Sequence, residues 1–315
     1  MKRMVKRAIP YLPKSLQSFL RNVAELRRQH TKAQRKARST VAVAEIVQKL
    51  DFLLPNGTQD VILHSSISNI GKLDVPATAL ADTLYRKIVG KGRTLVVPAL
   101  PFSTTMEEYL RSQRKFDVAS APNAMGALPN IFMAMHGARR SLHPTHSVVA
   151  LGPRADFYVA GHHLDPTPFG PHSPFRKLTE QNGSIIMLGV GLNSVTSFHV
   201  YEDLLGELLP FEVYLKEKFQ IAVVDENGAT TTVEAVCHDA RLSGRRECER
   251  ARAELNDAGA IATLPLGESE ISVIDARMFT YVLLDMLTKG KSIYGPVNLT
   301  SLQRKVILES AAEFR

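Results

Sequence analysis

The sequence has no tryptophan, little cysteine and no long apolar segment. Two cysteines, Cys237 and Cys248, are too few for a disulfide framework and lack the spacing of metal ligands. Because no run reaches about 18 apolar residues, no transmembrane helix is predicted. The basic N-terminus is not followed by the apolar core and small-residue cleavage site of a secretory signal. We therefore expect a soluble, cytoplasmic protein.

Acidic residues are almost absent from residues 1–40, where Glu25 stands among many lysines and arginines. The net charge of +8 therefore belongs to this segment, and the rest of the chain is slightly acidic. Apolar side chains recur in the segment at helical spacing. These residues are Leu12, Leu16, Phe19, Leu20 and Val23. The pattern predicts a basic amphipathic helical arm over residues 1–40.

Two roles remain open for this arm. It can pack its apolar stripe on the rest of the chain or on a second copy in a homo-oligomer. Alternatively, residues 1–38 can dock on a partner or on the anionic inner face of a membrane. Only two aromatic residues, Tyr11 and Phe19, lie in the arm, and no nucleic-acid-binding motif is present. We expect no nucleic-acid partner.

Apolar strands alternate with amphipathic helices over residues 41–315. A hairpin is predicted at 212–236, where the Asn-Gly of "ENGA" suits a tight turn. The alternation indicates one domain, 41–315, with a layered α/β/α fold around a central mixed β-sheet. Helices are predicted at 41–53, 77–90, 125–137 and 274–290, and strands at 60–66, 93–100, 146–153 and 184–191.

Three serines follow an apolar strand in "ILHSSISNIG", residues 62–71. The hydroxyls of Ser65, Ser66 and Ser68, with free backbone N–H groups at such a turn, suit phosphate oxygens. The pattern is neither a Walker loop nor G-x-G-x-x-G. Taken alone, it is also typical of a serine-rich turn that caps a helix.

A histidine follows another strand end in "IIMLGVGLNSVTSFHVYED", residues 185–203. If a helix starts near Ser194, His199 lies in its second turn, where the positive helix end favours a neutral ring. Glu202 lies one turn further on the same face and can orient that ring. A solvent-facing pair on an ordinary helix would have the same spacing.

Other polar residues carry weaker signals. His143 and His146 flank a proline before a strand and are expected to be structural. Glu107 and Glu108 either hold a substrate amine or occupy the first turn of a plain helix. Because no H-E-x-x-H pattern is present, no metal is expected.

Together, these segments resemble the aminoglycoside 3-N-acetyltransferase family in order and spacing. The resemblance is dense over residues 60–205 and looser to about 290. It implies that family's own α/β fold and acetyl-CoA-dependent transfer to an amine; the R/Q-x-x-G-x-G/A loop of the common acetyltransferase fold is missing. The resembling stretches are "LHSSISNIG", "GRTLVVPA", "FDVASAPNAMGALPN", "RSLHPTHSVVALGPRA", "TPFGPHSPFRKL" and "GSIIMLGVGLNSVTSFHVYED".

The resemblance also implies roles for individual residues. It places a turn against the CoA phosphates and pantetheine arm, and it makes His199 the base that takes a proton from the acceptor amine. Transfer would be direct, in a ternary complex, with turn N–H groups or hydroxyls facing the thioester oxyanion. The turn comprises His64, Ser66 and Gly71, with Ser65 and Ser68 beside them.

The chain departs from the family near a late strand. The family has a second catalytic acid there, and Cys237 stands in its place, with Asp239 two residues on. Asp239 and the nearer Glu202 are therefore alternative partners for His199.

Three functions remain open. An N-acetyltransferase could act on an amino sugar, which the mild charge of the body and the basic arm favour. It could instead act on an aminoglycoside and confer antibiotic resistance. The third hypothesis is a non-catalytic binding protein with a degenerate transferase body.

Overall fold

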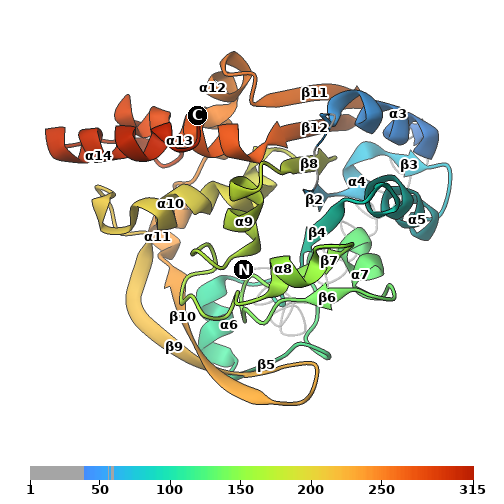
Figure 1. The fold of residues 1–315 in the computed structure, drawn as a ribbon, viewed down its shortest axis with the longest axis horizontal. Helices are drawn as coiled ribbons and strands as arrows, with labels where there is room; N and C mark the ends of the chain where they lie inside the picture. The colour runs from blue at the N-terminus through green and yellow to red at the C-terminus, as the bar shows by residue number, and fades with distance from the viewer. Residues whose placement is uncertain (1–38, 56, 58–59) are drawn as a thin grey trace, which may run out of the picture.

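A seven-stranded mixed sheet forms the centre of the protein (Figure 1). The computed structural model describes residues 39–55, 57 and 60–315, so the predicted arm lies outside the described residues except for its last two positions. Strands follow the order β11-β12-β8-β2-β4-β7-β6, with β2 parallel to β8 and β4 and every other pairing antiparallel. The predicted mixed sheet is confirmed. Its strands are β2 (Asp60–Ser65), β4 (Thr94–Pro98), β6 (Arg139–Arg140), β7 (Val148–Leu151), β8 (Ser184–Leu188), β11 (Ile261–Leu266) and β12 (Ser269–Asp275).

Helices cover both faces of this sheet. In β2, Ile62 packs into one apolar cluster whereas Val61 and Leu63 pack into the other, as the two-residue period of a strand requires. Both faces are therefore buried, which explains the continuous apolar runs of these strands. One face carries α3 (Val43–Leu53), α5 (Ala77–Ile88) and α7 (Ala127–Met133); the other carries α8 (Ala155–Val159), α9 (Pro174–Glu180), α10 (Val200–Leu205), α12 (Arg252–Asp257), α13 (Ala276–Thr288) and α14 (Ser301–Ala312).

The predicted hairpin forms a second sheet of its own. Strands β9 (Tyr214–Val224) and β10 (Thr230–His238) pair antiparallel, and β5 (Lys115–Asp117) adds parallel to β9. With α6 (Met106–Ser112), they close a separate apolar cluster at one end of the molecule (Figure 1). The antiparallel partner of β8 in the main sheet is β12, from a β11–β12 pair that the sequence pattern did not predict.

The register of β2 and β8 determines where the candidate site lies. β2 and β8 end side by side, because Ser65 is the register partner of Leu188. The serine turn and the turn before His199 therefore meet at the carboxyl ends of these two central strands. The remaining elements are α4 (Ile67–Ile70), α11 (Ala240–Ser243), β1 (Thr40–Val41), β3 (Lys72–Leu73), β13 (Lys291–Ser292) and β14 (Gly295–Pro296). Among the helices of the described residues, none has the length and hydropathy to cross a membrane.

Candidate active site

The serine turn after β2 and the glycine turn after β8 are joined by hydrogen bonds. The N–H of Ser66 donates to the carbonyl of Leu188 at 2.8 Å, and the Asn69 side chain donates to the carbonyl of Gly189 at 3.0 Å. Gly189 has a φ of +69°, and a Cβ there would lie 2.6 Å from the Ser66 carbonyl oxygen. Only glycine fits this close approach without displacing the serine turn.

His199 stands at the N-cap position of α10, not in the second turn of a helix. The expected start near Ser194 is wrong: Val195 is extended, with φ −78° and ψ 103°, and it separates two short 3-10 turns, Leu192–Ser194 and Thr196–His199. Regular α-helix begins only at Val200. His199 is 5% exposed, so almost all of its side chain is buried.

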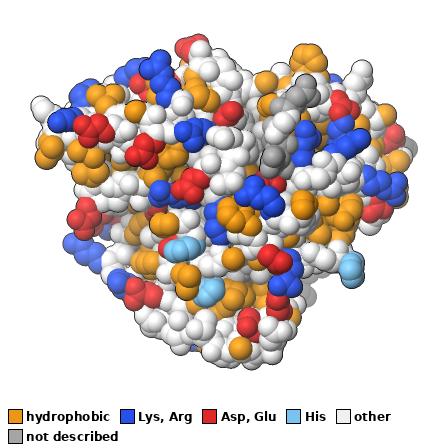
Figure 2. All heavy atoms as spheres, viewed as in Figure 1, with side chains coloured by type: hydrophobic (Ala, Val, Ile, Leu, Met, Phe, Trp, Pro, Cys, Tyr) orange, Lys and Arg blue, Asp and Glu red, His pale blue; other side chains and the backbone are white. Residues whose placement is uncertain are grey.

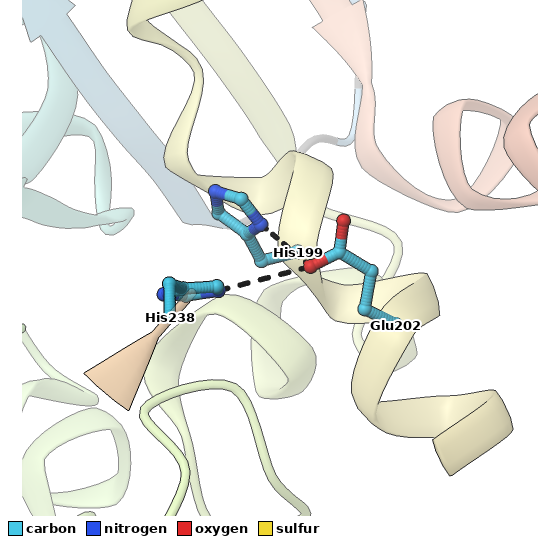
Figure 3. Close-up of side chains that lie close together, drawn as sticks. All are labelled: His199, Glu202 and His238. Atoms are coloured by element: carbon cyan, nitrogen blue, oxygen red, sulfur yellow. Dashed lines mark hydrogen bonds and ion pairs between the residues drawn. The ribbon is translucent and has the colours of Figure 1, made fainter. Parts of the chain in front are cut away.

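A buried carboxylate holds one nitrogen of this imidazole. Nδ1 of His199 lies 2.7 Å from Oε2 of Glu202, as Figure 3 shows. The other oxygen, Oε1, accepts a hydrogen bond from the Tyr294 hydroxyl at 2.7 Å. Glu202 is 1% exposed, so this is a buried orienting pair and not a solvent-facing one. The predicted same-face geometry of His199 and Glu202 is present.

Glu202 stays ionised in this setting. Burial alone would raise the pKa of its carboxyl, but the hydrogen bond with His199, helped by the nearby His238, outweighs burial and holds the pKa below its ordinary value. The Nε2 of His238 lies 3.7 Å from Oε2 of Glu202 (Figure 3). Burial, followed by repulsion from His199, lowers the pKa of His238.

An arginine holds the second nitrogen of His199. Nη1 of Arg246 lies 2.6 Å from Nε2. A guanidinium has only donors, so Nε2 is the acceptor and carries no proton in this arrangement. Nδ1 therefore carries the ring proton and donates it to Glu202. The ring is thus held as the tautomer whose lone pair, on Nε2, points away from Glu202.

The structure does not bring Asp239 to His199. The Asp239 carboxylate accepts from the backbone and side chain of Arg241 at the start of α11, and this pairing lowers its pKa. Cys237 is buried, its thiol donates to the His238 carbonyl, and burial raises its pKa to about 11. Of the two alternatives, Glu202 is the residue in contact with His199.

His199, Glu202 and His238 bring three potential metal-ligand atoms within 4.8 Å of one another. Two ligands on tetrahedral zinc, with bonds of ~2.1 Å, would lie ~3.4 Å apart. The 2.7 Å between Nδ1 and Oε2 is instead the distance of a hydrogen bond. This geometry suits an orienting pair better than a metal centre.

The serine turn lines a cavity of about 520 Å³. His64, Ser65, Ser66 and Ser68 all contribute to its wall, and the Ser66 and Ser68 hydroxyls lie 3.2 Å apart. We call it the serine-turn cavity. Burial lowers the pKa of His64 to about 4, so this wall is uncharged at neutral pH. The remaining wall includes Gly126 and Leu128 from one segment and Ser194 and Thr196 from another.

A second cavity, of about 680 Å³, has Glu202 in its wall. We call it the acidic cavity, because carboxylates dominate its polar lining. Asp203 accepts from the Tyr214 hydroxyl at 2.6 Å, and burial raises its pKa to about 6. The carboxylates in the wall are Glu202, Asp203, Glu207 and Glu212.

Other residues singled out in the sequence have structural partners. Glu107 pairs with Arg111 one turn on, and the Glu108 N–H bonds to the Thr105 cap, so these acids begin a plain helix. His143 and His146 are buried around the Thr145 hydroxyl. No sequence pattern singled out His238 or Arg246, since neither lies near His199 in the chain.

The comparison with family models establishes the family. A model described as aminoglycoside 3-N-acetyltransferase matches residues 62–288. The chain belongs to the aminoglycoside 3-N-acetyltransferase family.

Curated relatives are distant and only partly matched. Aminoglycoside N(3)-acetyltransferase III of a Salmonella species is 32% identical over 176 residues, which are 51% of this chain and 59% of that protein. Aminoglycoside N(3)-acetyltransferase IX of Micromonospora chalcea is 31% identical over 157 residues, 46% of this chain and 55% of that protein. The chain thus spans little more than half the length of these relatives.

Solved structures share the fold. A binary complex of AAC-IIIb with CoASH has a TM-score of 0.65 at 22% identity, covering 80% of this chain and 97% of that one. A histidine-to-alanine mutant of aminoglycoside acetyltransferase AAC(3)-IVa, in complex with a gentamicin, has a TM-score of 0.64 at 22% identity, covering 80% and 90%. YokD of Bacillus subtilis has a TM-score of 0.62 at 20% identity, covering 78% and 92%.

Proposed function

We propose that this chain is an acetyl-CoA-dependent N-acetyltransferase that acylates an amino group of an amino sugar. The observation that carries the proposal is the held tautomer of His199, with Nδ1 on a buried carboxylate and a lone pair on Nε2. The segment that carries this ring also borders both cavities. Ser194 and Thr196 line the serine-turn cavity, and Glu202 lines the acidic cavity.

The serine-turn cavity fits the donor. Acetyl-CoA, when bound, supplies an acetyl group activated as a thioester. Hydroxyls of Ser65, Ser66 and Ser68 offer hydrogen-bond donors to phosphate and amide oxygens, and the neutral wall at His64 suits a pantetheine arm. The Nε2 atom of His64 is buried without a hydrogen-bond partner among the described residues, which leaves it free for a ligand.

His199 supplies the base. An amine must lose a proton as it attacks a carbonyl, and Nε2 can accept that proton within ~3 Å, a contribution of ~10²–10⁴-fold to the rate. Glu202 keeps the ring oriented and stabilises the imidazolium that forms. Turn N–H and hydroxyl groups near Ser66 are candidates to meet the developing oxyanion.

An aminoglycoside acceptor is the second candidate. Four carboxylates line the acidic cavity, and they would attract ammonium groups. A solved relative holds a gentamicin. Against this, acidic and basic side chains are interspersed on the face drawn in Figure 2, with no broad acidic field for a polycation.

An acceptor screen tests the proposal. CoA release is followed on mixing the protein with acetyl-CoA and either amino sugars, including nucleotide-linked ones, or aminoglycosides. We expect a higher kcat/KM with an amino sugar. A higher kcat/KM with aminoglycosides would transfer the proposal to the second candidate. No release with any amine, together with no binding of CoA in a calorimetric titration, would favour a non-catalytic binding protein.

A further inference from the structure

Arg246 covers the nitrogen that the proposed chemistry needs. The residue lies between α11 and the 3-10 turn Cys248–Ala251, and its Nη1 is 2.6 Å from Nε2 of His199. Its side chain makes no ion pair within 4.0 Å with any carboxylate in the part of the chain that the structure describes. A charged group thus touches the base while it lacks an anionic partner.

The neighbours of this guanidinium do not supply that partner. Its charge acts on His146, Tyr294 and Cys248, none of which is an anion: burial holds the pKa of His146 well below its ordinary value and raises those of Tyr294 and Cys248. Arg246 itself is exposed, so its long side chain is free to turn. A guanidinium offers five donors, and a single ring nitrogen satisfies one of them.

The amine of an acceptor has to take the position that Arg246 now holds. Proton transfer to Nε2 needs the amine nitrogen within ~3 Å of it, which is where Nη1 lies. An ammonium group arriving there meets a like charge. Arg246 can turn away into solvent, and it gains a charge-assisted contact when the same acceptor offers it an anion.

We propose that Arg246 selects an acceptor that carries a phosphate or carboxylate close to its amino group. The guanidinium covers His199 in the free enzyme and turns to bind that anion when the amine enters. The inference rests on the proposed function and specifies its acceptor as an anionic amino sugar. It also predicts discrimination against polycations, which bring positive charge and no anion to Arg246.

The phosphates of the acyl donor are not the anion in question. The thioester has to lie at His199 for transfer, and the whole pantetheine arm separates it from those phosphates. Arg246 touches Nε2 and is therefore at the thioester end. The KM for acetyl-CoA should accordingly be insensitive to Arg246.

Binding of matched probes tests the proposal without turnover. Glucosamine, glucosamine 1-phosphate and muramic acid, whose carboxylate is attached through the oxygen on the carbon next to the amine-bearing carbon, are titrated into the protein with CoA present, by calorimetry. The native protein should bind at least one anionic probe ~10–100-fold more tightly than glucosamine, because a charge-assisted bidentate contact is worth a few kcal/mol. The phosphate and carboxylate probes show which anion is preferred.

Variants assign the effect to the residue. Arg246→Gln should abolish the preference, Arg246→Lys should restore part of it, and Arg241→Gln, at the exposed pair with Asp239, should leave it intact. Equal affinity for charged and uncharged probes in the native protein would overturn the proposal. So would an unchanged preference in Arg246→Gln with a native melting temperature.

Kinetic measurements distinguish failure of the specificity role of Arg246 from failure of the proposed transferase function. If amines are acetylated but the anionic ones gain nothing, the specificity role fails while the transferase proposal stands. If Arg246→Gln lowers kcat equally for every acceptor, Arg246 serves the oxyanion and not the acceptor's charge, which also overturns the inference. Absence of turnover with preserved anion preference would count against the transferase proposal alone.

Discussion

At the scale of single residues, the proposed chemistry depends on the tautomer of His199. Glu202 accepts from Nδ1, which leaves the lone pair on Nε2 for an incoming amine. Loss of the carboxylate charge removes both the orientation and the stabilisation of the imidazolium. We expect Glu202→Gln to lower kcat by about 10²-fold, with little change in the Kd for CoA. The measurement is steady-state acetyl transfer beside calorimetry.

Asp239→Asn is the informative comparison for that variant. Asp239 is engaged by Arg241 and does not contact His199. Its substitution should leave kcat close to that of the native protein. A loss as large as that of Glu202→Gln would restore Asp239 as the functional acid.

His64 makes the fold sensitive to acid. Burial lowers its folded-state pKa from 6.5 to about 4, so the unfolded chain binds a proton first as the pH falls. Stability is therefore full above about pH 6.5 and decreases as the pH falls towards 4, by about 2 kcal/mol between pH 7 and 5 for this residue. His64→Gln should flatten that part of the stability curve, measured by urea unfolding. Parallel curves for the two proteins would contradict this assignment.

Some site residues could be predicted and others could not. His199 and Glu202 are three positions apart, so local helical geometry sufficed to pair them. Arg246 and His238 come from segments about forty or more residues away, and a strand end and an irregular turn bring them in. No local pattern in the sequence carries that information.

At the scale of elements, Gly189 sets the position of the serine turn. An alanine there would combine a positive φ with a Cβ 2.6 Å from the Ser66 carbonyl oxygen. Gly189→Ala should lower the free energy of unfolding by about 2–3 kcal/mol and raise the Kd for CoA. Calorimetry and denaturant titration give the two values.

Gly228→Ala is a matched control for that substitution. Gly228 also has a positive φ, +83°, but no atom lies within 4 Å of the added Cβ. Gly228→Ala should lower the free energy of unfolding by only about 1 kcal/mol and leave the affinity for CoA unchanged. Equal effects of the two alanines on CoA binding would show that the close approach at Gly189 is not what shapes the turn.

Local signals located the helices and strands that were predicted, but they did not reveal every element of the fold. Continuous apolar runs and glycine stops located the central strands. β11, which the sequence pattern did not predict, contains Pro265; proline is tolerated there because β11 lies at the edge of the sheet. The helix expected from Ser194 instead breaks at the extended Val195, a tertiary effect that spacing alone does not reveal.

At the scale of the whole molecule, residues 41–314 build the apolar clusters on both faces of the main sheet. Removal of residues 1–38 should therefore leave a cooperative thermal transition and acetyl transfer in solution. This outcome would favour a docking role for the predicted arm. Loss of the transition would show that the arm packs on the body or on a second copy of the chain.

The central claim is that Nε2 of His199 takes the proton of an amine acetylated from acetyl-CoA. It is tested most directly by CoA release from the native protein and His199→Ala, with the best acceptor of the screen, beside the Kd for CoA. We predict a ~10²–10⁴-fold loss of kcat with unchanged CoA affinity. Retained kcat, or an equal loss of affinity, would contradict the account.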